Sequence, residues 1–373
     1  MGIDKIKNYV FEFILVTFLF FILFVSTIYK TIYLSIFLLI YMLILKKIIK
    51  KRNIISHYKK EVTIVMSAMG IIYLIVFYLM GIHFGFYESS VKFGKVALLY
   101  YIIPITIIVY STEVIREVFL AQRGKFAKII PFIAFVLIDL IIYGEVYSYS
   151  NLDDLLIIIG FIVFSSISSN LLYNYISLRH GKNSVVVYRL ITILYAFIIP
   201  YTPNIYIFFR TFLKIIYPYF IYLFLEYTYS KTNFAVAYKD KKREIMWTTI
   251  LIIVLSSVTM LISCQFKYGI LVIGSKSMTG ALNMGDTTIF VKYDKQNIKT
   301  GDIIVFKKDG LQIIHRVIDK KDINGSIRYY TKGDANMSAD DYYLVDSDII
   351  GISKLRIKYI GYPSIWIKEM FNK

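Results

Sequence analysis

The sequence is poor in cysteine and in charged residues. Its single cysteine, Cys264, excludes an intrachain disulfide, so a domain outside the membrane must fold without one. Only 18% of the 373 residues are charged, whereas 57% are hydrophobic, and the chain contains 34 Tyr and 28 Phe. Soluble globular proteins have a different balance. The composition therefore indicates a membrane protein, and Cys264, at the end of an apolar run, is expected to face lipid or pack rather than react.

The formal net charge of +18 does not predict nucleic-acid binding. Lys and Arg are concentrated between apolar runs, where the positive-inside rule places them on the cytoplasmic side of a membrane. One of the alternate loops, at 145–154, is acidic. The basic loops, all predicted to be cytoplasmic, are 46–60, 116–128, 179–182 and 239–243.

Apolar runs recur through the first 265 residues, and most have the length of about 20 residues that crosses a hydrocarbon core. They predict nine transmembrane helices. The first run is followed at once by a second and not by a small-residue cleavage site, so it is a span rather than a signal peptide. The predicted spans are 9–29, 31–45, 63–83, 96–115, 129–147, 154–176, 185–201, 204–226 and 247–265.

Pro200 and Pro203 separate the seventh and eighth spans. Two prolines this close are compatible with a tight turn or with a kink inside one long helix. Merging the two spans would leave an odd number of crossings between two basic loops that both favour the cytoplasmic side. We therefore predict an outer turn here. The ninth span then delivers residues 267–373 to the outer face, with the N-terminus in the cytoplasm.

The predicted spans contain a few ionisable residues, chiefly Asp139, with Glu113, Arg210 and Lys214 closer to span ends. A charge is costly in hydrocarbon, which makes each of them a functional candidate. An equally supported alternative is that they form helix-packing hydrogen bonds or extend to the interface.

The pattern changes after Phe266 to short alternating segments separated by Gly, Asp, Asn and Lys, which is typical of a β-rich domain. We find no internal repeat or low-complexity tract. The predicted fold class is a membrane α-helical bundle followed by a C-terminal all-β domain. Its parts are a polytopic region at 1–245, a membrane anchor at 246–266 and an extracytoplasmic domain at 267–373.

Three polar elements in the C-terminal part are candidates for chemistry. Ser275 and Ser277 follow the last span directly, but a serine needs a base and an oxyanion donor before it can act as a nucleophile. The apolar segment 301–306 and a turn at Asp309 and Gly310 then predict a β-hairpin.

That hairpin would display His315, a side chain suited to accept a proton near neutral pH. Of the three other histidines, His57 and His180 lie in predicted cytoplasmic loops and His83 at a span end. Asp334 and Asp340 are both candidates for a carboxylate that orients the imidazole. In isolation, each element is more typical of an ordinary strand or of an Asx-turn loop than of a catalytic site.

The order of the motifs is more specific than any one of them. S-x-S-M at 275–278, G-D-I-I-V-F at 301–306, H-R-V at 315–317 and T-K-G-D-x-N at 331–336, with Asp340 beyond, follow a membrane span. This series resembles the sequence boxes of type I signal peptidases. The histidine stands where the common bacterial enzymes have lysine, so the resemblance is to the archaeal and endoplasmic-reticulum type. It covers residues 247–373 only.

The resemblance implies a residue-by-residue assignment of a catalytic site. Ser277 matches the nucleophile and His315 the general base. Asp340 matches the third catalytic member, and Asp334 the Gly-Asp acid that is also implicated. Ser275, together with the backbone N–H of Ser277, matches the oxyanion hole. The chain departs from the family at Gly280, where proline is usual, and we expect a less rigid loop there.

The resemblance further implies a serine endopeptidase that removes signal peptides from exported precursors at the outer face of the cytoplasmic membrane. Its partners would be signal peptides and the lipid bilayer, with no cofactor, no metal and no nucleic acid; no particular partner in the secretion machinery is identified. Two alternatives remain: a transporter or sensor with an inactive peptidase-like domain, and a peptidase whose first eight spans form a separate functional module.

Overall fold

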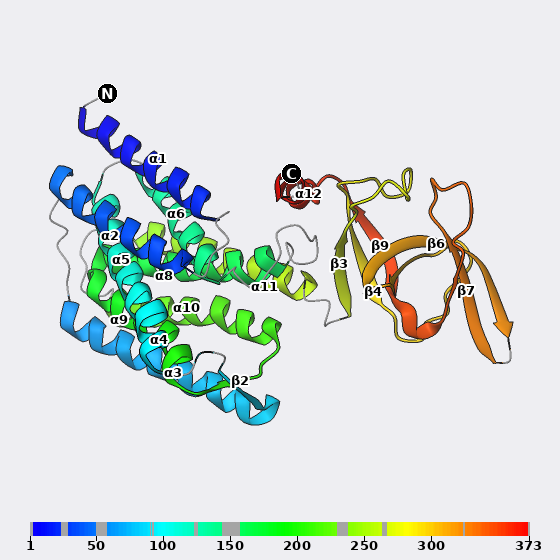
Figure 1. Ribbon diagram of the computed structural model, residues 1–373, viewed down its shortest axis with the longest axis horizontal. Helices are drawn as coiled ribbons and strands as arrows, with labels where there is room; N and C mark the ends of the chain where they lie inside the picture. Colours follow the sequence, from blue (N-terminus) through cyan, green and yellow to red (C-terminus); the bar gives the residue numbers. More distant parts are fainter. Residues whose placement is uncertain are drawn as a thin grey trace. The chain divides into compact units, whose positions relative to one another are not determined.

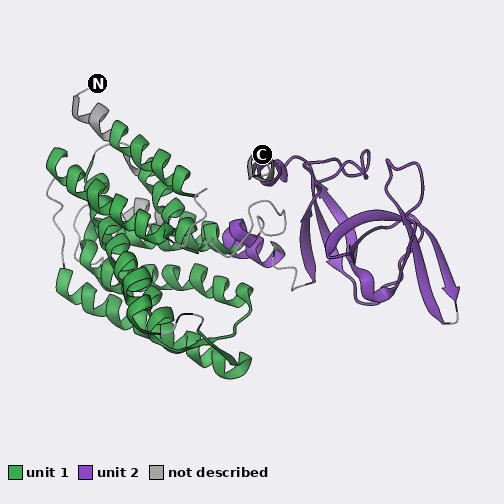
Figure 2. Ribbon diagram, viewed as in Figure 1, with its two compact units in different colours: residues 1–145, 161–253 green, residues 146–160, 254–373 purple. Residues whose placement is uncertain are grey.

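The computed structural model describes residues 3–23, 29–49, 58–89, 91, 93–122, 126–143, 157–229, 238–262, 267–323 and 325–371. The chain forms two compact units, green and purple in Figure 2. Unit 1 comprises residues 1–145 and 161–253, and unit 2 comprises residues 146–160 and 254–373. Cys264 and the acidic loop at 145–154 lie outside the described residues.

Helices occupy each of the nine ranges in which a span was predicted (Figure 1). Among the described residues, five of the helical segments are long and apolar enough to cross a membrane: Lys30–Ile48, Lys59–Phe84, Lys95–Leu120, Ile158–Arg179 and Ile207–Tyr229. Shorter apolar helices lie at Tyr9–Leu23, Ile129–Tyr143 and Ile245–Leu261. Nine crossings therefore stay a prediction.

The helical elements have the following bounds: α1 Ile3–Leu23, α2 Lys30–Ile48, α3 Lys59–Phe84, α4 Lys95–Ala97, the π-helix η1 Leu98–Ile102, α5 Ile103–Leu120, α6 Phe126–Tyr143, the π-helix η3 Ile158–Val163, α8 Phe164–Arg179, α9 Lys182–Ile198, α10 Ile207–Tyr229 and α11 Tyr238–Ile262. Helix α11 starts well before the predicted span at 247–265, because Lys and Arg are good helix formers and continue the helix beyond its apolar part. The predicted boundary at 245/246 thus falls inside one helix.

The segment at Pro200–Pro203 is a break between two helices, as predicted. Helix α9 ends at Ile198, and α10 begins at Ile207. Between them, β2 (Tyr201–Pro203) pairs antiparallel with β1 (Phe86–Glu88), which follows α3 directly. A single kinked helix would have continued from α9 into α10, whereas here the two helices are separated by the strand β2.

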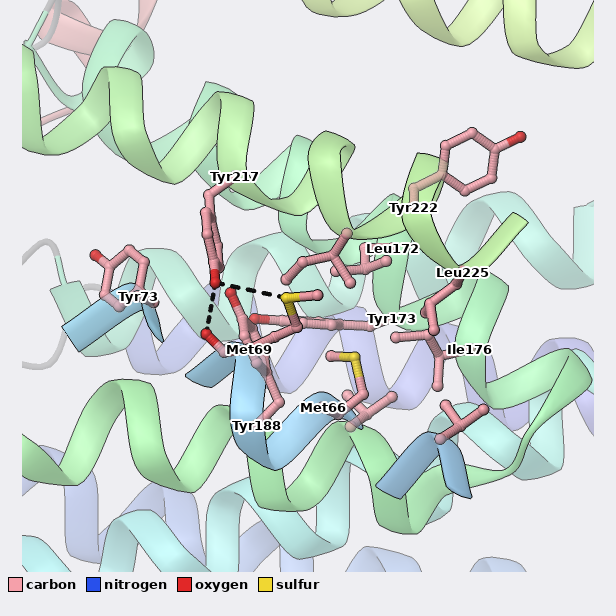
Figure 3. Packing of buried hydrophobic residues seen from close by; sticks show 13 residues of the cluster. Met66, Met69, Tyr73, Leu172, Tyr173, Ile176, Tyr188, Tyr217, Tyr222 and Leu225 are labelled. Atoms are coloured by element: carbon pink, nitrogen blue, oxygen red, sulfur yellow. Dashed lines mark hydrogen bonds between the residues drawn. The ribbon is translucent and has the colours of Figure 1, made fainter. Parts of the chain in front are cut away.

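A large apolar cluster holds α3, α8, α9 and α10 together (Figure 3). Aromatic and sulfur-containing side chains from facing helices interdigitate there, which excludes voids. The hydroxyl of Tyr217 is also satisfied, since its Oη donates to the Met69 carbonyl oxygen at 2.6 Å. The buried residues of the cluster are Val62, Met66, Met69, Tyr73, Leu172, Tyr173, Ile176, Val185, Tyr188, Tyr217, Ile221, Tyr222 and Leu225.

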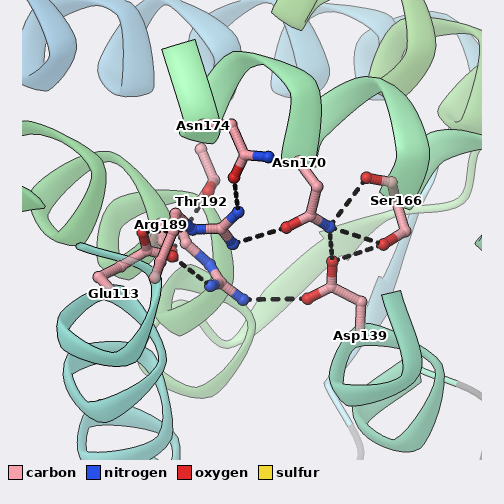
Figure 4. A network of polar contacts seen from close by, with 8 residues as sticks. Glu113, Asp139, Ser166, Asn170, Asn174, Arg189 and Thr192 are labelled. Carbon is pink, nitrogen blue, oxygen red and sulfur yellow. Dashed lines mark hydrogen bonds and ion pairs between the residues drawn. The ribbon is translucent and has the colours of Figure 1, made fainter. Parts of the chain in front are cut away.

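A closed ring of hydrogen bonds and ion pairs joins α5, α6, α8 and α9 (Figure 4). Glu113 accepts from Arg116 Nε at 2.8 Å and from Arg189 Nη1 at 2.7 Å. Arg189 Nη2 donates to Asp139 Oδ1 at 3.0 Å, and Asn170 Nδ2 donates to Asp139 Oδ2 at 2.8 Å. Arg116 Nη2 closes the ring on Asn170 Oδ1 at 2.6 Å.

All five members of this ring are buried, and its two carboxylates balance its two guanidinium groups. A buried charge is tolerated when it is paired and its remaining hydrogen bonds are made. For Glu113 and Asp139, the structure therefore favours the helix-packing alternative. Lys214 instead places its ammonium 4.4 Å from the centre of the Tyr143 ring.

Unit 2 contains a seven-stranded antiparallel sheet in the order β3-β4-β9-β5-β6-β7-β8. The strand β5 is buried on both faces, because Ile304 and Phe306 enter one apolar cluster while Val305 enters another. This double burial accounts for the unbroken apolar run in its sequence. The strands are β3 Tyr268–Val272, β4 Thr287–Lys292, β5 Ile303–Lys308, β6 Leu311–Ile323, β7 Ser326–Lys332, β8 Tyr343–Leu344 and β9 Ile349–Ile357.

The predicted hairpin is confirmed as β5 paired with β6. Asp309 and Gly310 form its two-residue turn with φ values of 49° and 80°, and such a pair of positive φ angles matches the twist of the flanking strands. The domain is not purely β, since it ends in helix α12 (Tyr362–Phe371). Ile365 of this helix is buried, whereas Trp366 is exposed.

Candidate active site

Ser277 lies in the turn between β3 and β4, where the burial of Met278 and a backbone hydrogen bond from Ala335 fix its position. Met278 is fully buried in one of the two apolar clusters of unit 2. The backbone N–H of Ala335 donates to the Ser277 carbonyl oxygen at 2.8 Å. A Cβ on Gly333 would lie 2.7 Å from the same oxygen, so the T-K-G-D loop can approach the serine this closely only with glycine there.

His315 reaches Ser277 from the adjacent hairpin. It lies on β6, opposite Ile304 of β5, and only 7% of its surface is exposed. Its Nε2 atom lies 3.2 Å from Ser277 Oγ, which is hydrogen-bonding distance. The sheet thus brings together two side chains that are 38 positions apart in the sequence.

Asp340 binds the other nitrogen of the imidazole. Its Oδ2 atom lies 2.7 Å from His315 Nδ1. The same oxygen accepts a hydrogen bond from Thr331 Oγ1 at 2.6 Å, and the Asp340 backbone N–H donates to the Thr331 carbonyl oxygen at 2.9 Å. Thr331 is fully buried on β7, so the carboxylate is fixed by a rigid strand as well as by the histidine.

Asp334 pairs with Arg316 and not with His315. It receives two hydrogen bonds from Arg316, from Nε at 2.8 Å and from Nη2 at 2.6 Å, in the bidentate geometry that guanidinium and carboxylate favour. The hydrogen bonds from Arg316 to Asp334 raise the pKa of the guanidinium, which stays charged. Because Asp334 precedes Ala335, this pair also holds the loop that binds the Ser277 carbonyl oxygen. The structure thus places one of the two candidate aspartates against His315 and the other against Arg316.

A second ion pair supports the loop behind the serine. Asp286 is 1% exposed and accepts from Arg356 Nε at 2.6 Å, while Arg356 Nη1 donates to the Ala281 carbonyl oxygen at 2.8 Å. Gly280 has a φ of 106°, which proline cannot adopt, and its N–H donates to Asn283 Oδ1 at 3.0 Å. The loop that lacks the usual proline is therefore held by hydrogen bonds.

The Ser275 hydroxyl lies beside the Ser277 hydroxyl, with 3.1 Å between the two Oγ atoms. Within the described residues, the backbone N–H of Ser277 makes no hydrogen bond. A hydroxyl and a backbone N–H are the kinds of donor that stabilise an oxyanion. No group of three or more His, Cys, Asp and Glu side chains in the described part of the chain is arranged to hold a metal ion.

Two features of the site were not predicted from the sequence. Thr331 was noted only as part of its motif; its burial, which obliges the hydroxyl to find a partner, becomes visible only in the structure. The pairing of Asp286 with Arg356 joins residues 70 positions apart and has no local signal.

A serine hydroxyl, an imidazole and a carboxylate in series are the arrangement of a serine hydrolase site. Comparison with known proteins agrees: residues 246–320 match the signal peptidase family, peptidase S26. The C-terminal part of this chain is thus similar to peptidase S26 domains, and its relatives support a type I signal peptidase of the endoplasmic-reticulum-like type.

The relatives of this domain include catalytic subunits of signal peptidase complexes. Over 111 residues the chain is 33% identical to signal peptidase complex catalytic subunit SEC11C of Homo sapiens and of Canis lupus familiaris; the match covers 27% of this chain and 57% of each relative. It is 33% identical over 112 residues to the SEC11 catalytic subunit of Lachancea thermotolerans, covering 27% of this chain and 66% of that protein. The chain thus spans just over half the length of the mammalian relatives.

Proposed function

We propose that this protein is a membrane-bound signal peptidase that cleaves N-terminal signal peptides from exported precursors. The observation that carries the proposal is the unbroken series from Ser277 Oγ through the His315 imidazole to Asp340, with steps of 3.2 Å and 2.7 Å. An inactive peptidase-like domain would be under no constraint to keep all three side chains in hydrogen-bonding distance of one another.

In the proposed reaction, Ser277 Oγ attacks the carbonyl carbon of the scissile peptide bond while His315 Nε2 takes its proton. Asp340 holds Nδ1–H and stabilises the imidazolium that forms. The Ser277 N–H and the Ser275 hydroxyl donate to the oxyanion of the tetrahedral intermediate. His315 then protonates the leaving amine, and a water molecule activated by the same imidazole hydrolyses the acyl-enzyme.

Asp334 and Thr331 act as positioning residues in this scheme. Asp334, through Arg316, sets the loop whose Ala335 N–H holds the Ser277 carbonyl oxygen. Thr331 sets the carboxylate of Asp340. Neither side chain needs to touch the substrate in order to affect the rate, since a small displacement of a catalytic group is enough to slow the reaction.

The proposed location is the cytoplasmic membrane, with the N-terminus inside and unit 2 outside. This orientation rests on the basic loops of the sequence. The apolar helices of unit 1 fit a membrane association. Ser275 follows the last residue of α11 by 13 positions, and the proposed substrate is itself a membrane-inserted signal peptide.

The test is processing of a reporter precursor by the full-length protein in vesicles. We expect Ser277→Ala and His315→Ala each to abolish cleavage, while Ser326→Ala, at an exposed position at the start of β7, and His83→Ala, on α3, keep it. A signal-peptide-derived acylating probe should label Ser277 in the unmodified protein and not in Ser277→Ala. Full cleavage by either catalytic variant would contradict the proposed mechanism.

A further inference from the structure

A cavity in unit 1 opens where helices α3 and α9 begin. Its volume is about 570 Å³, which falls within the usual range of sites for small ligands, about 300–1,000 Å³. Lys59, Lys60 and Thr63 line it from α3, Lys182 from α9, and Glu117 from α5. None of these residues has a part in the proposed proteolysis.

The charge of this cavity is positive. Three ammonium groups face one carboxylate, and that carboxylate is already paired, because Lys182 Nζ lies 3.1 Å from Glu117 Oε2. Lys59 and Lys60 are exposed and have no ion-pair partner among the described residues. Two uncompensated cations in one concave site attract an anion, and a phosphate group satisfies more than one ammonium at a time.

The two helix ends add to this charge. Thr63, near the start of α3, and Ser184, in the first turn of α9, are hydrogen-bonded, with 2.9 Å between their hydroxyl oxygens. Neither helix has a side-chain hydrogen bond at its N-cap. The positive ends of two helix dipoles therefore lie side by side at the cavity that the lysines already make basic.

An apolar stripe leads away from the cavity along α3. Ile64, which lines the cavity, is 70% exposed, and Ile71, Ile75 and Ile82 are 52%, 52% and 74% exposed. Their spacing of seven, four and seven residues places all four on one face of the helix. On an apolar helix long enough to cross a membrane, such a face contacts lipid chains. A ligand here would meet lysines at one end and isoleucines along its length.

We propose that this cavity binds the phosphate group of an anionic phospholipid whose acyl chains lie along the isoleucine stripe of α3. Lys59 and Lys60 contact the phosphate oxygens, and Lys182, already paired with Glu117, borders the headgroup. A free phosphate compound shares the headgroup chemistry but makes no use of the stripe, so the lipid is the occupant that both observations fit. A specific lipid at this position would anchor the start of α3 in the headgroup layer.

The experiment is a titration of the purified full-length protein in detergent micelles with phosphatidylglycerol or phosphatidylcholine, with bound lipids counted by native mass spectrometry. We expect one tightly retained phosphatidylglycerol and no retained phosphatidylcholine. The variant Lys59→Gln/Lys60→Gln should bind phosphatidylglycerol about 25-fold more weakly, since each lysine near an anionic headgroup contributes roughly a factor of five.

The matched control is Lys46→Gln/Lys47→Gln, which removes the same charge from exposed positions at the end of α2, outside the cavity. It should change binding less than twofold. Equal losses in the two double variants would mean diffuse attraction to a basic surface and would overturn the proposal, as would unchanged binding in the first. Glycerol 3-phosphate tests the source of the phosphate: we expect it not to displace the lipid, and displacement at equal concentration would assign the site to soluble phosphates instead.

Discussion

Thr331 offers a direct test of the geometry around Asp340. Thr331→Val keeps the shape of a fully buried side chain but removes the hydroxyl that donates to Asp340 Oδ2 at 2.6 Å. A hydrogen bond to a charged group contributes about 1.5–3 kcal/mol. If the hydrogen bond from Thr331 stabilises the transition state, in which the imidazolium forms, by that amount, then the loss of this hydrogen bond lowers kcat roughly 10- to 150-fold. KM should hardly change, because Thr331 is buried beneath the aspartate.

The assay compares initial rates of cleavage of a signal-peptide reporter by the full-length protein and its variants. Thr331→Ser is the matched control: it retains the hydroxyl and should recover most of kcat despite losing a methyl group. Thermal unfolding of each variant in detergent separates a positioning effect from loss of the fold. The reasoning is refuted if Thr331→Val keeps full kcat, or if Thr331→Ser loses as much as the valine variant.

Three other substitutions test separate parts of the structure. Asp334→Asn should slow cleavage of the reporter precursor less than Asp340→Asn does. The first change loosens a loop, whereas the second leaves the imidazolium without its carboxylate. Equal rates for the two variants would contradict the assignment of Asp334 as a positioning residue. Gly333→Ala should abolish labelling by the acylating probe, since the added Cβ would lie 2.7 Å from the Ser277 carbonyl oxygen; normal labelling would show that the loop can shift. Asp139→Leu should destabilise unit 1 by about 3–5 kcal/mol, because it breaks a buried ion pair. Asp139→Leu/Arg189→Leu should recover part of that loss in thermal unfolding, and no recovery would argue against the ring.

Much of the fold followed from local sequence patterns. The apolar runs predicted where helices form, because the length of a hydrophobic segment and the helix propensity of its residues are properties of that segment alone. The two prolines after α9 left a turn and a kink both open, and the break was predicted from the number of crossings between the basic loops. The Asp309–Gly310 pair predicted the β5–β6 hairpin, since a two-residue turn with positive φ is itself a local property.

The candidate site was only partly predictable. The order of the motifs singled out Ser277, His315 and two aspartates, but it left open which carboxylate meets the imidazole. In the structure, Asp340 does so, while Asp334 pairs with Arg316. Both aspartates lie between β7 and β8, and which carboxylate reaches the imidazole depends on the path of the chain between these strands.

By itself, the sequence determined the succession of apolar helices, the change to a β domain after Phe266 and the short motifs that carry the chemistry. Only the tertiary structure decided the partners: Thr331 for Asp340, Arg356 for Asp286, and the closed ring of charges between four helices. The physical reason is that hydrophobic length and turn preference act over a few neighbouring residues. A hydrogen bond between distant side chains, in contrast, depends on strand register and helix packing, which the whole chain sets together.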